Sequence, residues 1–238
     1  MSCQKLLKGK NVVFLPGWGF SASIWHDIGV SLTPNCYFLN FPEVSEKTCG
    51  ISGILQQLIT QIPDHSILIG WSLGGLLAIN LCTTFPDKFA KLILVASTPK
   101  FIVANQWPGV PLREANHFMN TAKKDIQKAL ATHSNLTICP FSKLALERHL
   151  NKNLSPKSLL FYLELLMNAD YRDIYLSLTL PILHLFGSKD AIISAHTMAA
   201  LQLSSSHITF KNLPEAGHIP FITNRKVTQK IIKKFIFA

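Results

Sequence analysis

The chain has 238 residues, of which 48% are hydrophobic and 15% are charged. Globular proteins have about 25% charged residues, so this composition allows a large buried core and excludes a mainly disordered chain. The formal net charge is +10, and such an excess favours acidic partners. No helix-turn-helix, zinc-finger or RNA-binding motif accompanies the charge, and we expect no nucleic-acid partner.

The five cysteines include no pair with C-x-x-C spacing. An odd number without such pairs predicts free thiols in a reducing compartment, so we expect a cytoplasmic protein. Residues 1–10 carry charge without a long apolar stretch after them, and we do not expect a secretory signal. The uncharged stretch 66–86 is long enough to span a bilayer. Glycines interrupt it, however, so a buried strand followed by a buried helix explains it better and no membrane association is expected.

Short β-type runs alternate with helical periodicity near both ends of the chain. This alternation predicts an α/β fold in which a mostly parallel central sheet has helices on both faces. The expected strands are 11–15, 36–41, 66–69, 91–96, 181–186 and 207–210. The expected helices between and after them are 23–32, 51–62, 73–85, 195–203 and 224–237.

The pattern changes between residues 105 and 177, where no strong strand signal occurs. Helices are predicted there instead, at 113–132, 142–150 and 155–169. The last has Ser155 as a candidate N-cap and Pro156 at its first position. A helical insertion between two strands of one sheet is typical of a lid over an active site. We therefore expect an α/β core of residues 1–104 and 178–238 and a helical lid at 105–177.

The strongest motif is Gly-Trp-Ser-Leu-Gly-Gly at residues 70–75, between a predicted strand and a predicted helix. It fits G-x-S-x-G in the context that a nucleophile elbow requires. In such an elbow the serine has a positive φ, so its hydroxyl projects from the sheet edge. Glycine is needed two positions to either side, because side chains there would collide with the turn. Ser72 is thus the candidate nucleophile, although a small-residue junction without chemistry has the same local pattern.

A serine hydroxyl needs a general base, and in this fold the chain order is serine, acid, histidine. His218 follows the last predicted strand and precedes the last predicted helix, and none of the other histidines has this setting. Asp190 follows the strand at 181–186. It is the candidate that fixes the imidazole tautomer and stabilises the imidazolium without taking its proton. Asp170 and Asp173 are the fallback candidates for this role.

An oxyanion hole requires two backbone N–H groups. We expect one from Leu73, directly after the nucleophile, where the helix also directs its N-terminal dipole. The other is expected from the loop 16–20, in which Trp18 is best placed. The chain has no H-E-x-x-H, P-loop or dinucleotide motif, so we expect neither a metal nor a cofactor.

With these residues placed, the chain resembles the biotin-pathway carboxylesterases, which hydrolyse the methyl ester of pimeloyl-acyl carrier protein. The tryptophan before the nucleophile and a Trp-Pro-Gly leading into the lid distinguish this family from the general hydrolase pattern. The resemblance implies that Ser72 forms an acyl-enzyme, that methanol leaves and that water frees the carboxylate. The family's oxyanion amides match Trp18 and Leu73. The matching segments are 17–19, 70–75, 96–101, 107–109 and 218–221.

The resemblance also implies an acidic acyl carrier protein as the partner, docked on a basic lid. Residues 125–128 resemble the family's lid helix, and Lys128 stands where a carrier-facing arginine is expected. Arg148 is a second candidate contact, because it lies in the densest basic stretch of the lid, with Lys143, Lys152 and Lys157. Carrier docking and a solvated basic face both explain this charge. We expect a monomer.

The sequence departs from the family pattern at two places, and it leaves two other functions open. Pro16 stands where the family has histidine, and residues 40–43 lack its usual Asp-x-Pro-Gly. An esterase or thioesterase acting on free short acyl esters would share every catalytic residue. A non-catalytic binding module with this fold would be expected to have lost one of the three catalytic positions, and all three are filled.

Overall fold

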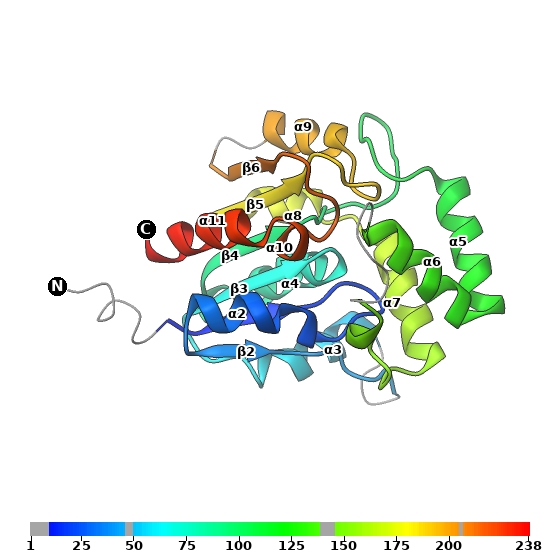
Figure 1. The fold of residues 1–238 in the computed structure, drawn as a ribbon, viewed down its shortest axis with the longest axis horizontal. Helices are drawn as coiled ribbons and strands as arrows, with labels where there is room; N and C mark the ends of the chain where they lie inside the picture. The colour runs from blue at the N-terminus through cyan, green and yellow to red at the C-terminus, as the bar shows by residue number, and fades with distance from the viewer. Residues whose placement is uncertain (1–9, 46–49, 139–145, 205–206) are drawn as a thin grey trace.

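A single sheet of parallel strands forms the centre of the molecule (Figure 1). The computed structural model describes residues 10–45, 50–138, 146–204 and 207–238. Within them the strand order is β2-β1-β3-β4-β5-β6, and every pairing is parallel. The α/β class predicted from the sequence is therefore confirmed. The strands are β1 (Val12–Leu15), β2 (Cys36–Phe38), β3 (Ser66–Trp71), β4 (Phe89–Val95), β5 (Ile182–Gly187) and β6 (Thr209–Leu213).

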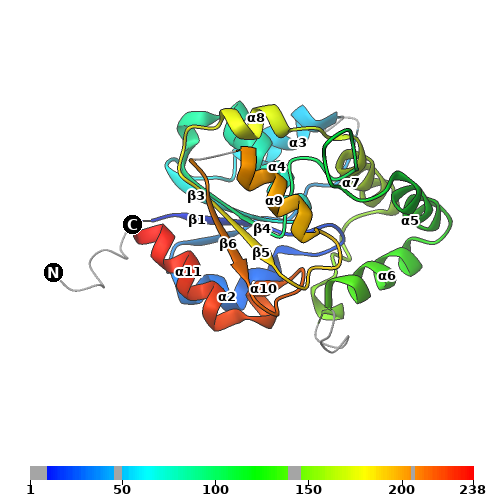
Figure 2. The same cartoon turned by 90° about the horizontal axis from the view of Figure 1, so that it is seen from above.

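Helices cover both faces of the sheet, which explains why its inner strands read as continuous apolar runs (Figure 2). Alternate residues of β1 enter opposite cores: Val13 and Leu15 pack in one, and Val12 and Phe14 in the other. The first core also receives α3 (Gly50–Ile59), α4 (Leu73–Thr84) and α9 (Ala195–Ser204). The second receives α2 (His26–Leu32), α10 (Pro220–Thr223) and α11 (Arg225–Phe237).

The strand register brings the loops that carry the candidate residues to one edge of the sheet. Leu15 of β1 is paired with Gly70 of β3, and Trp71 is paired with Val95 of β4. At the other side, Gly187 of β5 is paired with Leu213 of β6. Because all these strands run in the same direction, the loops after β1, β3, β5 and β6 begin at the same carboxyl edge.

Between β4 and β5 the chain forms helices beyond this edge (Figure 1). They are α5 (Leu112–Lys124), α6 (Ile126–Ile138), the 3₁₀ turn η5 (Glu147–His149) and α7 (Pro156–Asn168). The last helix before β5, α8 (Arg172–Ser177), packs against α4 instead (Figure 2). The prediction of one helix at 113–132 is wrong, because Asp125 has an extended backbone with φ −153° and separates α5 from α6. Its carboxylate accepts a hydrogen bond from the amide of Lys128 at 3.0 Å and so caps the second helix.

The ends of other helices and strands depend on contacts between residues that are far apart in the chain. The helix predicted at 142–150 lies partly outside the described residues, which show only η5 in that stretch. Lys143 lies wholly outside them. The helix predicted at 155–169 is confirmed, with the Ser155 hydroxyl accepting from the amide of Ser158. The strand predicted at 36–41 ends at Phe38, because the segment that follows docks on α7. There the Tyr162 hydroxyl donates to the carbonyl of Pro42 at 2.8 Å.

Candidate active site

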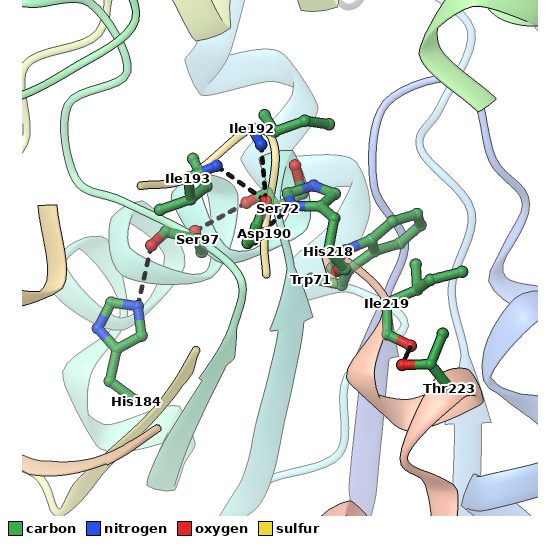
Figure 3. A network of polar contacts seen from close by, with 10 residues as sticks. All are labelled: Trp71, Ser72, Ser97, His184, Asp190, Ile192, Ile193, His218, Ile219 and Thr223. Atoms are coloured by element: carbon green, nitrogen blue, oxygen red, sulfur yellow. Dashed lines mark hydrogen bonds and ion pairs between the residues drawn. The ribbon is translucent and has the colours of Figure 1, made fainter. Parts of the chain in front are cut away.

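Ser72 occupies the turn between β3 and α4 with φ 54° and ψ −120°. A non-glycine residue with positive φ is held there only by its surroundings. Its amide donates to the carbonyl of Val95 at 3.0 Å, and its carbonyl accepts from the hydroxyl of Ser97 at 2.8 Å. The backbone of the candidate nucleophile is thus tied to β4 and to the residues that follow it (Figure 3).

The glycines around this turn are required by close backbone contacts. A Cβ added to Gly70 would lie 2.4 Å from the carbonyl oxygen of Gly74. One added to Gly74 would lie 2.4 Å from the carbonyl oxygen of Pro16. Neither contact involves a side chain that can turn away, so the elbow excludes any larger residue at these positions.

Gly70→Ala is expected to lower the free energy of unfolding by about 3 kcal/mol, the upper part of the range for overpacking, because its methyl group collides with backbone. Chemical denaturation measures this loss. Gly53→Ala, within α3, is the control and is expected to be neutral or stabilising, since alanine favours helix. Equal stability of the two variants would contradict the steric account.

The structure brings Asp190 and His218 together from the loops after β5 and β6. His218 Nδ1 donates to Asp190 Oδ2 at 2.9 Å, and both side chains are fully buried. The other oxygen, Oδ1, accepts from the amides of Ile192 and Ile193 at 2.8 and 2.9 Å (Figure 3). Because a carboxylate only accepts hydrogen bonds, the imidazole proton is held on Nδ1.

This tautomer leaves His218 Nε2 as a hydrogen-bond acceptor. Nε2 is buried and has no hydrogen-bond partner among the described residues. The Trp71 indole donates to the carbonyl of His218 at 2.8 Å, and its ring lies 5.6 Å from the imidazole. The residue before the candidate nucleophile therefore fixes the loop of the candidate base, a role that the sequence did not indicate.

The fallback acids lie elsewhere. Asp170 accepts two hydrogen bonds from Arg172, each of 2.8 Å, and pairs with Lys100 at 3.0 Å. The guanidinium of Arg172, followed by the ammonium of Lys100, holds the pKa of the Asp170 carboxyl well below its usual range. Asp173 lies on α8 next to this group. The geometry therefore favours Asp190 as the acid partner of His218.

Trp18 and Leu73 present the two amides expected for an oxyanion hole. Within the described part of the chain, neither amide donates to a protein acceptor. Leu73 is the first residue of α4, and its N–H therefore has no acceptor within the helix. The Trp18 ring is buried, and its indole N–H donates to the carbonyl of Leu159 on α7 at 2.8 Å.

A cavity of about 210 Å³ borders Ser72, which is 9% exposed. Its walls are mainly apolar and come from α5, α6, α7 and the loops at the sheet edge. The polar residues among them are Ser72, Glu114 and His133. The apolar lining consists of Trp18, Phe101, Val110, Ala115, Phe118, Leu136, Leu163, Leu166, Met167, Ala191 and Ile192.

His133 was not singled out by the sequence, because a lone histidine within a helix carries no motif. Its ring lies 5.3 Å from the ring of Trp18 and 6.3 Å from that of Phe118. Burial, and secondarily the nearby His218, lower the pKa of His133 to about 3. The ring is therefore uncharged at neutral pH.

A buried polar chain lies behind the elbow. His184 Nε2 donates to the carbonyl of Ser97 at 3.0 Å, and Nδ1 accepts from the Tyr175 hydroxyl at 2.9 Å. Ser97 in turn holds the carbonyl of Ser72. Figure 3 shows the part of this chain that runs from His184 through Ser97 to the nucleophile turn. His184 and Ser97 therefore support the positive φ of Ser72.

Stability is expected to fall as pH falls below about 6.5, the unfolded-state pKa of histidine, because burial lowers the pKa of His184 to about 3. Between these two values the unfolded chain binds a proton that the folded protein excludes. The loss attributable to His184 reaches about 2 kcal/mol at pH 5. Denaturation at pH 7 and pH 5 measures it, and His184→Gln, which retains hydrogen-bonding groups without titrating, is expected to lose less. An equal loss in both proteins would contradict this assignment.

The two candidate carrier contacts lie on separate elements. Lys128 is exposed on α6. Arg148 is exposed on η5, where its Nε donates to His149 Nε2 at 3.0 Å, and it borders a hollow with Asp27 and Arg225. Within the described ranges, no cluster of three or more His, Cys, Asp or Glu residues could hold a metal. No helix among those residues has the length and hydropathy needed to cross a membrane.

Comparisons with known proteins show which family the chain is similar to. A model of the alpha/beta hydrolase family matches residues 12–229. A pimeloyl-[acyl-carrier protein] methyl ester esterase of Wigglesworthia glossinidia brevipalpis is 31% identical over 95% of this chain and 93% of its own length. One from Legionella pneumophila strain Corby is 30% identical over 98% of both.

Solved structures show the same fold at lower identity. An esterase of Exiguobacterium antarcticum is 18% identical with a TM-score of 0.87, over 97% of this chain and 92% of that chain. The enol-lactonase of Burkholderia xenovorans LB400 is 17% identical with a TM-score of 0.76, over 97% and 92%. The family expected from the sequence motifs is confirmed: the chain belongs to the alpha/beta hydrolase family, in the group that contains the pimeloyl-[acyl-carrier protein] methyl ester esterases.

Proposed function

We propose that this chain is a serine carboxylesterase that hydrolyses the methyl ester of pimeloyl-acyl carrier protein in biotin synthesis. The reaction class is supported mainly by the buried Asp190–His218 pair. The unbonded Nε2 of His218 lies at the sheet edge that also bears the Ser72 elbow. The substrate is supported by the name and near-complete coverage of the relatives.

In the first step, the Ser72 hydroxyl attacks the ester carbonyl carbon while His218 Nε2 takes its proton. Hydrogen bonds between such groups are often long without substrate and tighten when it binds. The amides of Trp18 and Leu73 donate to the oxygen that becomes negative. Asp190, held by the amides of Ile192 and Ile193, stabilises the imidazolium without leaving its position.

In the second step, the carbon–oxygen bond to the methoxy group breaks. His218 returns its proton to that oxygen, and methanol leaves an acyl group on Ser72. Water then gives a proton to His218 Nε2 and attacks the acyl carbon. The bond to Ser72 breaks, Ser72 regains the proton, and the carboxylic acid is released and gives its own proton to the solvent.

The apolar cavity suits a hydrocarbon acyl chain. Leu163, Leu166 and Met167 line it from α7, and Phe118 lines it from α5. We assign residues 105–177 as the lid over this cavity, with 1–104 and 178–238 as the hydrolase core. Since the lid supplies most of the wall, it determines which acyl groups fit.

The basic lid is the proposed docking surface for the acidic carrier, with Lys128 and Arg148 as contacts. All catalytic groups come from one chain, so the reaction needs only a monomer. Cys36 and Cys82 are free thiols, which supports a reducing, cytoplasmic setting.

Pimeloyl-carrier methyl ester incubated with the protein is expected to lose the mass of one methylene group. The value of kcat/KM is expected to be much higher for the carrier-linked ester than for free dimethyl pimelate. Equal values would instead favour an esterase for free short acyl esters. An unchanged carrier-linked substrate would remove the assignment.

Lys128→Glu is expected to lower kcat/KM for the carrier-linked ester by about three- to tenfold, mainly through KM, because it reverses an exposed charge in the contact. Hydrolysis of the free ester should not change. Lys226→Glu, which reverses an exposed charge on α11, is the matched control. Equal effects of the two substitutions would show that only the net charge matters.

A further inference from the structure

His133 has a buried nitrogen for which the mechanism above supplies no partner. Among the described residues, the buried side-chain atoms without a hydrogen bond are His133 Nε2, Ser134 Oγ and His218 Nε2. Buried polar atoms are nearly always bonded, and an exception calls for a specific explanation. For His218 the explanation is the serine hydroxyl that it deprotonates. For His133 the cavity offers a place for a partner, because the ring lines that cavity together with Ser72.

The position of His133 indicates which part of a substrate it meets. Its ring packs edge-on against Trp18, whose amide is a proposed donor to the oxyanion. It also lies 6.0 Å from the ring of Phe20, which packs 5.1 Å from that of Trp71, and Trp71 in turn lies 5.6 Å from His218. The acyl chain beyond the ester carries no polar atom until its carrier-linked end. The substrate atoms near His133 are therefore those of the reacting ester.

The surroundings of His133 suit an uncharged ligand that accepts a hydrogen bond. The aromatic neighbours of His133, which are Trp18, Phe20 and Phe118, provide no charge. Burial keeps the imidazole uncharged, so it offers one N–H donor. An ester oxygen accepts such a hydrogen bond.

We propose that His133 is a specificity-determining residue that donates a hydrogen bond from Nε2 to an oxygen of the bound ester. This inference rests on the proposed function and adds a contact to the ester from a residue outside the triad and the oxyanion hole. It requires the tautomer that is protonated at Nε2, and it gives the buried nitrogen its partner only when substrate is bound.

The test compares His133→Phe with His133→Gln. Phenylalanine retains an aromatic ring against Trp18 and Phe118 but cannot form the hydrogen bond. Glutamine places an amide at a similar reach. We expect His133→Phe to lower kcat/KM for the carrier-linked methyl ester about tenfold, whereas His133→Gln remains within about threefold of the native enzyme.

Measuring the stability of the variants distinguishes a hydrogen-bonding role of His133 from a role in packing. The phenylalanine variant should unfold at the same or a higher denaturant concentration than the native protein, because it removes an unbonded polar atom. Unchanged kcat/KM in His133→Phe, or an equal loss in His133→Gln, would overturn the proposal.

If the native protein does not hydrolyse the carrier-linked ester, the proposed function fails separately. The same proteins are then compared on p-nitrophenyl butyrate, which presents the same ester oxygens. A lower kcat/KM of His133→Phe on that substrate, with a near-native value for His133→Gln, would still support the role of His133. Equal kcat/KM values in the native protein and both variants would overturn it.

Discussion

Ser72→Ala is expected to lower kcat by about a million-fold, the scale seen when a serine hydrolase loses its nucleophile. Without Oγ, no acyl-enzyme forms and His218 has no proton to accept. The fold should not change, because the bonds to Val95 and Ser97 use only the backbone of residue 72. Mass spectrometry of the pimeloyl-carrier methyl ester, together with fluorophosphonate labelling, measures the loss.

Ser97→Ala is the matched control for this prediction. It also removes a buried hydroxyl, but the carbonyl of Ser72 keeps its bonds from the amides of Gly75 and Leu76. We expect at most about a tenfold decrease in kcat, the cost of one hydrogen bond. Turnover by Ser72→Ala within tenfold of the native rate would remove Ser72 as the nucleophile.

Asp190→Asn is expected to lower kcat about ten-thousandfold with little change in KM, the effect known for this substitution in a serine protease triad. The amides of Ile192 and Ile193 require an acceptor, so the asparagine oxygen takes the place of Oδ1. Its NH₂ group then faces His218 Nδ1 and donates to it. The imidazole proton moves to Nε2, where the proton of Ser72 must be received.

Asp170→Asn is the control for this second prediction. Asp170 bonds to Arg172 and Lys100 rather than to a histidine. We expect kcat to remain within about twofold of native, since an exposed pair of this kind contributes little. If Asp190→Asn kept a tenth of the native activity, or if Asp170→Asn proved equally damaging, Asp190 would not be the orienting acid.

The local sequence pattern was sufficient to predict the sheet and to locate the candidate residues. Apolar runs predicted its strands, and the glycines around Ser72 predicted the positive φ that the structure shows. Chain order alone singled out Asp190 and His218, which the structure brings within 2.9 Å. These features depend on residues close in sequence or on the fixed order of the fold.

Features that depend on distant contacts were not predictable. The shortened β2 reflects docking on α7, and the Trp71–His218 hydrogen bond joins residues 147 positions apart. His133 becomes notable only when its unbonded nitrogen is seen beside the cavity. The break at Asp125 had a local signal, because aspartate is a good N-cap, but helical periodicity on both sides obscured it.

Hydrogen bonds anchor α7 to the loops after β1 and β2. The Trp18 indole donates to the carbonyl of Leu159, and the Tyr162 hydroxyl donates to the carbonyl of Pro42. The amide of Val44 donates to the Ser158 hydroxyl at 2.8 Å. A displacement of α7 would therefore pull on the loop that carries Trp18, the proposed oxyanion donor. A substitution that loosens α7 is thus expected to disturb this loop as well as the cavity wall.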